Sequence, residues 1–119
     1  MEQAIEQIFQ ESIAVKQATV KALKPLIKQA AETIIEAMKK NRRVFFFGNG
    51  GSAADSQHIA AEFIGRFMKE RRSLPALALT TDSSILTALG NDYTFDIVFA
   101  RQLEGLGQEG DVAFGISTS

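Results

Sequence analysis

The sequence predicts an α/β protein in which a three-layer, doubly wound parallel sheet follows an N-terminal helical arm. The first observation is the apolar run from Arg43 to Phe47, which is too short for a buried helix and leads into a glycine cluster and then a helical pattern. Such a junction is typical of a buried parallel strand that turns sharply into a helix. The second observation is the order of the later elements, strand, helix, strand, helix and strand, with polar connections between them.

Residues 1–40 are predicted to form the helical arm. Apolar residues recur at steps near three, four and seven from about residue 3 to 24, which indicates an amphipathic helix. Pro25 interrupts this pattern, and a second helix is expected to follow as far as about Lys40. Two long helices are more than a short sheet needs, so we expect an arm that packs partly on another subunit. A local helical hairpin is the alternative.

Residues 41–119 are predicted to form the sheet domain, with strands at about 43–47, 76–79 and 112–116. Helices are expected at about 53–69, from the polar run 80–84 to Leu89, and from Phe95 to Gly107. Gly90 is expected to end the second of these helices, before a turn at 91–93. The charged segment 69–73 is expected to be a solvated loop.

The chain ends at Ser119, directly after the third predicted strand. Doubly wound folds usually carry about five or more strands, and three leave one side of the sheet incomplete. We therefore expect the sequence to represent the N-terminal part of a longer domain.

Composition and charge exclude several function classes. Of 119 residues, 45% are hydrophobic and 23% are charged, which is typical of a globular domain and not of a disordered or fibrous chain. Thirteen basic and fourteen acidic residues leave a net charge of −1, so no bulk attraction to nucleic acid or to an anionic membrane is expected. The absence of cysteine removes disulfides, thiolate metal sites and a cysteine nucleophile. Without a secretory signal or an apolar run of membrane-spanning length, a cytoplasmic protein is expected.

The glycine cluster from Gly48 to Ser52 is the first candidate site. Its backbone N–H groups are unhindered by side chains and lie at the start of a helix, where the dipole favours an anion such as a phosphate. Gly48, Gly50 and Ala53 also satisfy the dinucleotide fingerprint, which needs an acidic residue about twenty positions on. Asp82 lies 34 residues after Gly48, so this use is disfavoured. A tight turn without a ligand is the remaining alternative.

His58 and Glu62 lie four residues apart on the predicted helix after the loop, on one stripe with Asp55, Gly65 and Arg66. His58 is the only histidine in the chain. A histidine and a carboxylate at this spacing can share a metal ion, or the carboxylate can act as a general base that the histidine orients. An ordinary surface pair that contributes little to stability is the plainer interpretation.

Polar residues also follow the third predicted strand and the second predicted helix. Ser117, Thr118 and Ser119 offer hydroxyls and N–H groups at the carboxyl end of a parallel strand, beside the loop after the first strand. Ligands of open α/β sheets bind in this crevice. Asn91 and Asp92 are able to reach the same rim, although the pair taken alone indicates a plain turn.

Together these segments resemble the SIS (sugar isomerase) domain family, and within it the sedoheptulose 7-phosphate isomerases, also called phosphoheptose isomerases. The resemblance extends over essentially the whole chain. The matching segments are 47–52, 57–62, 65–67, 74–76, 89–92, 110–111 and 115–119. The resemblance implies a flavodoxin-like fold of five parallel strands, assembled as a homotetramer with the N-terminal helices in the subunit contacts.

The resemblance also implies a reaction and a set of site residues. The reaction is the isomerisation of sedoheptulose 7-phosphate to D-glycero-D-manno-heptose 7-phosphate, the first step toward the heptose of bacterial lipopolysaccharide. Glu62 matches the catalytic base, and His58 with Glu62 matches two ligands of a zinc ion found in some members. The residues that match substrate contacts are Asn49, Gly50, Gly51, Ser52, Asn91, Asp92, Ser117, Thr118 and Ser119. A carboxylate beside a cation suits this chemistry, because it supplies a base and stabilises enediolate oxygens.

The chain departs from the family's pattern in one respect. The matching catalytic histidine, a neighbouring glutamine and the Gly-Asn-Ser that completes the phosphate loop would all lie beyond Ser119. We therefore expect activity only in a longer protein, with the chain alone inactive.

Two hypotheses that assign the chain to other functional classes remain. A non-catalytic relative, the SIS protein that binds the replication initiator, looks similar from the N-terminal helix onward. In that relative the position of Glu62 lacks a carboxylate and the loop reads Gly-Thr-Ser, whereas this chain has Glu62 and Gly51. The third reading is a SIS-type sensor of sugar phosphates within a larger protein, for which no linker or partner domain is visible.

Overall fold

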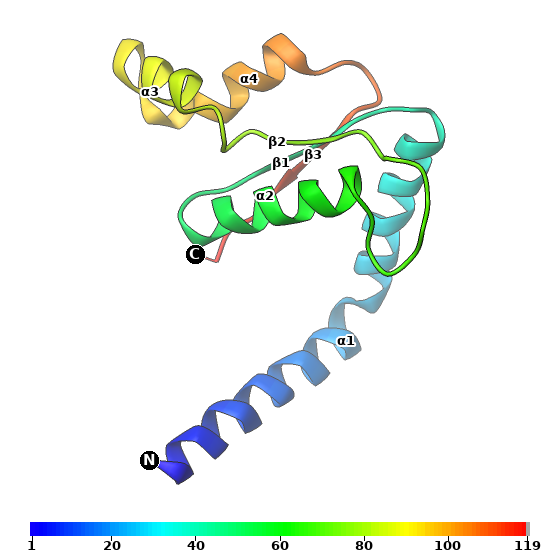
Figure 1. Cartoon of the computed structure of the whole chain (residues 1–119). Coiled ribbons are helices and arrows are strands. Elements are labelled where there is room, and N and C mark those ends of the chain that lie inside the picture. The colour runs from blue at the N-terminus through cyan, green and yellow to red at the C-terminus, as the bar shows by residue number, and fades with distance from the viewer. Residues whose placement is uncertain (119) are drawn as a thin grey trace. The chain divides into compact units, whose positions relative to one another are not determined.

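A computed structural model describes residues 1–118 of the chain. It begins with one helix, α1 (Glu2–Lys39), in place of the two helices predicted on either side of Pro25 (Figure 1). The prediction of a break at this proline is therefore wrong. A proline in a helix interior removes one backbone hydrogen bond and crowds the preceding turn, at a cost of about 3 kcal/mol. The long helical segments on both sides outweigh this local cost.

The chain divides into two compact units, Met1–Thr33 and Ile34–Ser119. The first unit consists of the N-terminal part of α1, and its apolar side chains remain largely exposed. Ile8 and Phe9 are each 65% exposed, and Val20 is 59% exposed. The pattern predicted for residues 3–24 is thus helical, but its apolar residues do not form a core within this unit. No helix within residues 1–118 combines the length and the apolar character needed to cross a membrane.

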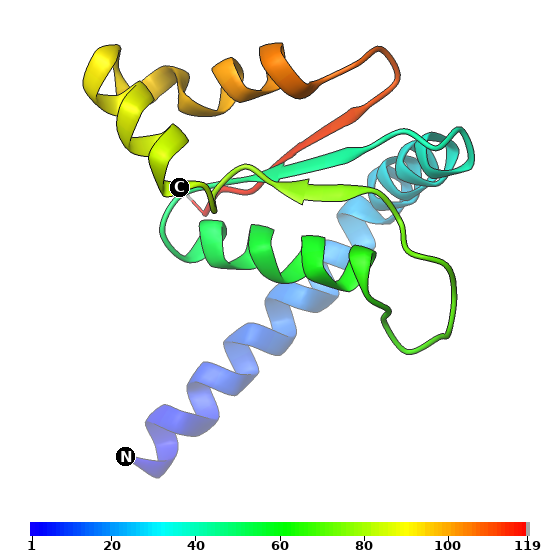
Figure 2. The ribbon, with the colours of Figure 1, turned by 45° about the horizontal axis from the view of Figure 1, so that its top comes forward.

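The second unit is built on a parallel sheet of β1 (Val44–Phe47), β2 (Ala76–Ala78) and β3 (Val112–Gly115). The strand order is β2-β1-β3, and both outer strands pair with β1 in parallel. Figure 2 shows α2 (Gly51–Ile64) on one face of the sheet and α3 (Ser83–Asp92) and α4 (Val98–Leu106) on the other. The predicted doubly wound α/β class is confirmed, and each strand lies within one residue of its predicted ends.

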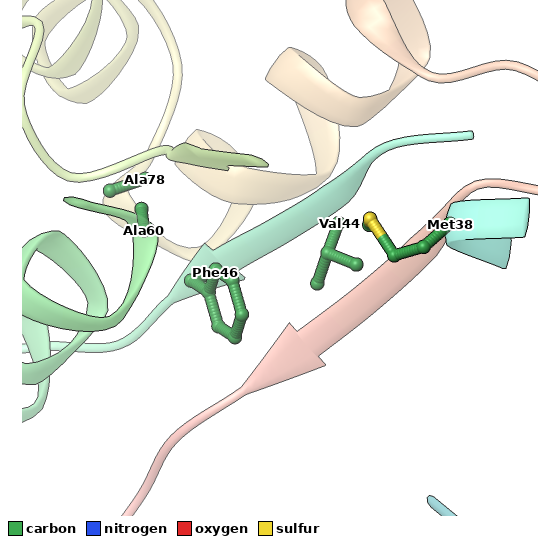
Figure 3. Packing of buried hydrophobic residues seen from close by; sticks show 5 residues of the cluster. All are labelled: Met38, Val44, Phe46, Ala60 and Ala78. Carbon is green, nitrogen blue, oxygen red and sulfur yellow. The ribbon is translucent and has the colours of Figure 1, made fainter. Parts of the chain in front are cut away.

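The central strand β1 is buried on both faces, as its uninterrupted apolar run predicts. On the α2 face, Val44 and Phe46 belong to a cluster whose other members are Met38, Ala60 and Ala78 (Figure 3). Side chains alternate along a strand, so the neighbouring phenylalanines face the other helices. The ring of Phe47 lies 5.2 Å from that of Phe99 in α4. This core holds the carboxyl ends of the strands in fixed positions.

α2 ends at Ile64, five residues before the predicted end at 69. Gly65 and Arg66 therefore lie beyond the helix. The prediction that they continue the stripe of His58 and Glu62 is wrong, because such a stripe needs continuous helical backbone.

α3 begins where the sequence predicts but ends later. Asp82 is its N-cap, and Oδ1 of this residue accepts a hydrogen bond from the backbone N–H of Ile85 at 2.9 Å. Gly90 does not end the helix, which continues through Asn91 to Asp92. The predicted turn at 91–93 is therefore wrong. One glycine inside a helix costs only about 1 kcal/mol relative to alanine, so it does not end a helix by itself.

α4 follows a short 3₁₀ turn, η1 (Phe95–Ile97), and ends at Leu106 before Gly107, as predicted. The buried side chain of Gln102 ties this helix to the sheet. Its Nε2 donates hydrogen bonds to the carbonyl oxygens of Leu79, just after β2, and of Val98, each at 3.0 Å.

Asp111 ties the turn before β3 to the start of β1. Its Oδ1 accepts the backbone N–H of Arg43 and its Oδ2 accepts that of Gln108, both at 2.8 Å. Burial of the carboxyl group by itself raises the pKa of Asp111, but the two N–H donors and the charges of Arg43 and Arg42 hold this pKa below its usual range. An ionised carboxylate therefore aligns the two strands whose far ends form the candidate site.

Candidate functional site

The loop that joins β1 to α2 depends on glycine at two positions. Gly50, the N-cap of α2, has φ 60° and ψ −123°, a backbone conformation that glycine adopts at the lowest cost. Gly48 has no room for a side chain, because a Cβ atom there would lie 2.6 Å from the carbonyl oxygen of Ile116 and 2.7 Å from Cβ of Ser52. The glycine cluster thus brings the end of β1 against the segment that follows β3.

A hollow of about 450 Å³ lies at this junction, at the carboxyl ends of β1 and β3, and is called the loop hollow below. It lies at the point of the sheet where the chain order reverses, with β2 on one side of β1 and β3 on the other. Ligands of doubly wound folds bind at such a point. The lining residues are Phe47, Gly48, Asn49, Ser52, Phe99, Gly115, Ile116, Ser117 and Thr118.

The loop hollow brings together only part of the predicted substrate contacts. Asn49, Ser52, Ser117 and Thr118 line it. The predicted contacts at 50 and 51 lie in the same loop but do not line the hollow within residues 1–118, and Ser119 lies outside the described residues. The hollow combines hydroxyl and amide groups with a helix start, which suits an anionic ligand.

The first turn of α2 is held firmly beside this hollow. Ser52 is only 7% exposed, and its carbonyl oxygen accepts a hydrogen bond from the hydroxyl of the fully buried Ser56 at 2.7 Å. Thr80, which follows β2, donates from its hydroxyl to the carbonyl oxygen of Ala53 at 3.3 Å. These contacts fix the start of the helix in relation to the sheet.

His58 and Glu62 lie on one face of α2, as their spacing predicts. His58 Nε2 lies 3.2 Å from Glu62 Oε1, and the two side chains are 74% and 37% exposed. The pair borders a second, mostly apolar hollow of about 360 Å³, called the helix hollow below. The two hollows share no lining residue in the described part of the chain. The predicted base and the glycine loop of one chain therefore face different hollows. The helix hollow is lined by His58, Ile59, Glu62, Phe63, Phe67, Arg71 and Leu74.

The charged segment 69–73 was predicted to be a solvated loop, but one of its charged side chains, Arg71, contacts the protein. Its guanidinium group lies against the end of α2 and donates to main-chain carbonyl oxygens there. The bond to Glu62 is 2.8 Å long and the bond to Phe63 is 3.0 Å long. Carbonyl groups in the last turn of a helix lack partners within the helix, so an arginine in the following loop can satisfy them.

Asn91 and Asp92 occupy the exposed end of α3. Asn91 Nδ2 lies 3.4 Å from Asp92 Oδ1. Asn91 borders a third, open hollow of about 840 Å³ together with other residues of α3 and Phe95. Within residues 1–118, neither member of the pair lines the loop hollow. Among the described residues, the structure therefore does not bring this pair into the loop hollow.

Two aromatic residues of the loop hollow were not identified as site residues from the sequence. Phe47 and Phe99 both line it. The sequence predicts Phe47 in a buried strand and Phe99 within a helix, because an apolar pattern gives no signal that separates a packed ring from a pocket wall. The position of Phe47 directly before the glycine cluster was the available signal.

The His58–Glu62 pair has donor types that zinc prefers, an imidazole nitrogen and a carboxylate oxygen. Both side chains reach solvent, so a cation can approach them without disturbing the core. Among residues 1–118, no group of three or more histidine, aspartate or glutamate side chains is placed to hold a metal ion. The pair thus fits two ligands of a zinc site and does not complete one.

Sequence comparison relates the chain to known proteins. Residues 7–119 match the SIS domain family. The phosphoheptose isomerase of Aquifex aeolicus is 58% identical over 119 residues, which is 100% of this chain and 62% of that protein. The phosphoheptose isomerase of Roseiflexus sp. is 54% identical over 111 residues, which is 93% of this chain and 56% of that protein.

Solved structures agree with the sequence comparison. The phosphoheptose isomerase of Neisseria gonorrhoeae matches with a TM-score of 0.88 at 48% identity, over 99% of this chain and 61% of that one. The phosphoheptose isomerase of Francisella tularensis matches with a TM-score of 0.91 at 39% identity, over 98% of this chain and 61% of that one. The chain therefore spans about three fifths of the length of these two structures. The family match and the shared fold extend over nearly all of its residues, and the chain belongs to the SIS domain family.

Proposed function

We propose that the complete protein containing this chain is a cytoplasmic isomerase that converts sedoheptulose 7-phosphate to D-glycero-D-manno-heptose 7-phosphate. The observation that carries the proposal is the 58% identity, over 119 residues, to a protein named phosphoheptose isomerase. The experiment that tests it is to incubate the complete protein with sedoheptulose 7-phosphate and to follow the aldose product by NMR. Absence of the product under conditions where the protein is folded would contradict the proposal.

Glu62 is the proposed base. Moving the carbonyl group from C2 to C1 requires removal of a proton from C1, formation of an enediolate and return of a proton to C2. One carboxylate oxygen of Glu62 lies 3.2 Å from His58 Nε2, which leaves the other oxygen available for the proton. A zinc ion bound by this pair would supply positive charge near the enediolate oxygens. The resemblance places the partner acid in a histidine that is not part of this chain.

The loop hollow is the proposed phosphate site. It offers the side chains of Asn49, Ser52 and Thr118 beside a helix start, where backbone N–H groups and the helix dipole favour an anion. Its volume of about 450 Å³ accommodates a phosphate with part of a sugar chain. Contacts from Gly50, Gly51, Asn91, Asp92 and Ser119 remain predictions.

The separation of the two hollows favours a site shared between subunits. Ser52 and Glu62 are ten residues apart on α2, which is about 15 Å along the helix axis. An extended seven-carbon chain with its phosphate spans about 10 Å, given carbon–carbon bonds of about 1.5 Å. We therefore propose that the loop hollow of one copy receives the His58–Glu62 pair of another. The exposed apolar residues of Met1–Thr33 support the proposed homotetramer, because a partner helix would bury them.

Mixed oligomers test this arrangement. Asn49→Asp places a carboxylate in the phosphate site, and Glu62→Gln removes the base, so each variant alone should lose activity. Subunits of the two variants, unfolded and reassembled together, should regain activity, since some sites then combine an intact loop with an intact base. Reassembly of each variant alone is the control, and sedimentation equilibrium reports the number of subunits. A mixture that stays as inactive as its components would place both residues in one subunit's site.

Removal of metal tests the proposed zinc ion. Dialysis of the complete protein against a chelator should lower the rate of conversion, and added zinc should restore it, because the ion would stabilise enediolate charge. Elemental analysis before dialysis should find zinc, and the variant His58→Ala should retain less of it. An unchanged rate in a zinc-free protein would reduce His58 to an orienting or structural role.

A further inference from the structure

We propose that Arg71 is a positioning residue, which fixes the last turn of α2 and so holds the Glu62 side chain in place for proton transfer. The inference rests on the proposed function, because that function assigns the base to Glu62. It adds to the residues that support catalysis one from the charged loop 69–73, for which the sequence predicts only a solvated surface.

The contacts of Arg71 are concentrated on the end of one helix. Its Nη2 donates to the carbonyl oxygen of Glu62 at 2.8 Å. Its Nη1 lies within hydrogen-bond distance of the carbonyl oxygens of Phe63 at 3.0 Å, Gly65 at 3.4 Å and Arg72 at 2.9 Å. The planar guanidinium fork therefore satisfies carbonyl groups that the helix itself leaves without partners.

The guanidinium group of Arg71 forms no ion pair with a carboxylate among the described residues. None of the ion pairs in the described part of the chain includes Arg71; the nearby pair in the same segment joins Arg66 to Glu70 at 3.3 Å, with both side chains exposed. Arg71 also lines the helix hollow together with His58 and Glu62. The same guanidinium group thus binds the main chain of Glu62 and borders the hollow into which its side chain faces.

The main-chain bond matters because Glu62 lies in the last turn of α2, where helices fray. Loss of the Arg71 bonds would let this turn move while the first turn, held by Ser56 and Thr80, stays in place. A displacement of about 1 Å at a catalytic group can lower the rate by about 10²-fold. The effect should fall on kcat, since the phosphate is bound in the other hollow.

Arg72 provides a matched control in the same loop. Its Nη2 donates to the carbonyl oxygen of Met38, at the end of α1, at 3.1 Å. Arg71 and Arg72 are thus adjacent arginines that each bind the carbonyl end of a helix, but only Arg71 binds the helix that carries Glu62. A general loss of stability should affect both variants, whereas a positioning role should appear only at Arg71.

The test compares Arg71→Ala, Arg71→Lys and Arg72→Ala in the complete protein. We expect Arg71→Ala to lower kcat by about 10²-fold with KM changed less than about twofold. Arg71→Lys should recover little of this loss, because an ammonium group cannot form the planar fork. Added guanidinium ion should restore part of the activity of Arg71→Ala, and Arg72→Ala should keep the wild-type kcat.

Hydrogen exchange supplies a readout that does not depend on the reaction. Amides in the last turn of α2 should exchange faster in Arg71→Lys than in the wild type, with exchange in the first turn unchanged. Wild-type kcat in Arg71→Lys, or an equal loss in Arg72→Ala, would overturn the positioning role. A wild-type protein without isomerase activity would instead overturn the proposed function. In that case, equal hydrogen exchange of the last turn of α2 in Arg71→Lys and in the wild type would separately show that Arg71 does not fix this turn.

Discussion

Replacement of Glu62 by glutamine should abolish the isomerisation of sedoheptulose 7-phosphate while leaving its binding nearly intact. The amide keeps the size of the side chain and its ability to bond His58, but it cannot accept a proton from carbon. Loss of a general base lowers a rate by about 10²–10⁴-fold. Turnover measured by NMR should therefore fall by at least about 10²-fold, and the dissociation constant from calorimetry should change little.

Glu104→Gln is the matched control for this experiment. Glu104 is also an exposed helical carboxylate, and it lies 3.7 Å from Arg101 on α4. Its removal should leave turnover unchanged, because it borders neither the loop hollow nor the helix hollow. Equal turnover by Glu62→Gln and the wild type would remove Glu62 from the mechanism and would favour the non-catalytic binding protein.

The sheet was predictable because its signals are local and strong. The uninterrupted apolar run of β1 and the glycine cluster after it predict a buried parallel strand that leads into a helix, and the structure has both. Alternating strands and helices then leave few arrangements other than a doubly wound sheet. The start of α3 within the polar run 80–84 was predictable for the same reason, since a side chain of this kind bonds a backbone group a few residues away, as Asp82 does.

The two predictions in which a single residue was expected to end a helix are wrong for the same physical reason. Pro25 and Gly90 were interpreted as helix ends from their intrinsic preferences, but each costs only a few kcal/mol or less and the surrounding helix outweighs it. The early end of α2 is accompanied by a contact from outside the helix. Its last carbonyl groups found a partner in Arg71, which lies several residues downstream in a loop. A contact of this kind depends on the path of the loop, which residue patterns do not specify.

The candidate site was predictable as a set of residues and not as an arrangement. The motifs single out Asn49, Ser52 and Glu62, and the structure places the first two at the loop hollow and Glu62 at the helix hollow. Sequence spacing says nothing about which hollow each one faces. The division between the loop hollow and the helix hollow appears only in the structure, and it is the reason to expect a site that two subunits complete.

Replacement of Gly48 by alanine should both destabilise the protein and disrupt the loop hollow. The new Cβ atom would lie 2.6 Å from the carbonyl oxygen of Ile116 and 2.7 Å from Cβ of Ser52. The first of these is a backbone atom and Ser52 belongs to the firmly held first turn of α2, so neither can move aside cheaply. Overpacking of this kind costs about 1–3 kcal/mol. Thermal unfolding should therefore occur several degrees lower, and inorganic phosphate should stabilise the variant less than the wild type.

Gly105→Ala separates this effect from the general consequence of adding a methyl group. Gly105 lies within α4, and among the described residues a Cβ atom there would meet no atom within 4 Å apart from the neighbouring backbone of its own helix. Alanine should stabilise that helix by about 0.5–1 kcal/mol, so the two glycine variants should shift the unfolding temperature in opposite directions. If Gly48→Ala unfolded at the wild-type temperature and bound phosphate equally well, the close approach of the glycine loop to the segment after β3 would not be what forms the site. If phosphate binding were lost without a change in the unfolding temperature, the loop would have moved to make room for the methyl group. The position of Gly48 would then matter for the hollow and not for the stability of the fold.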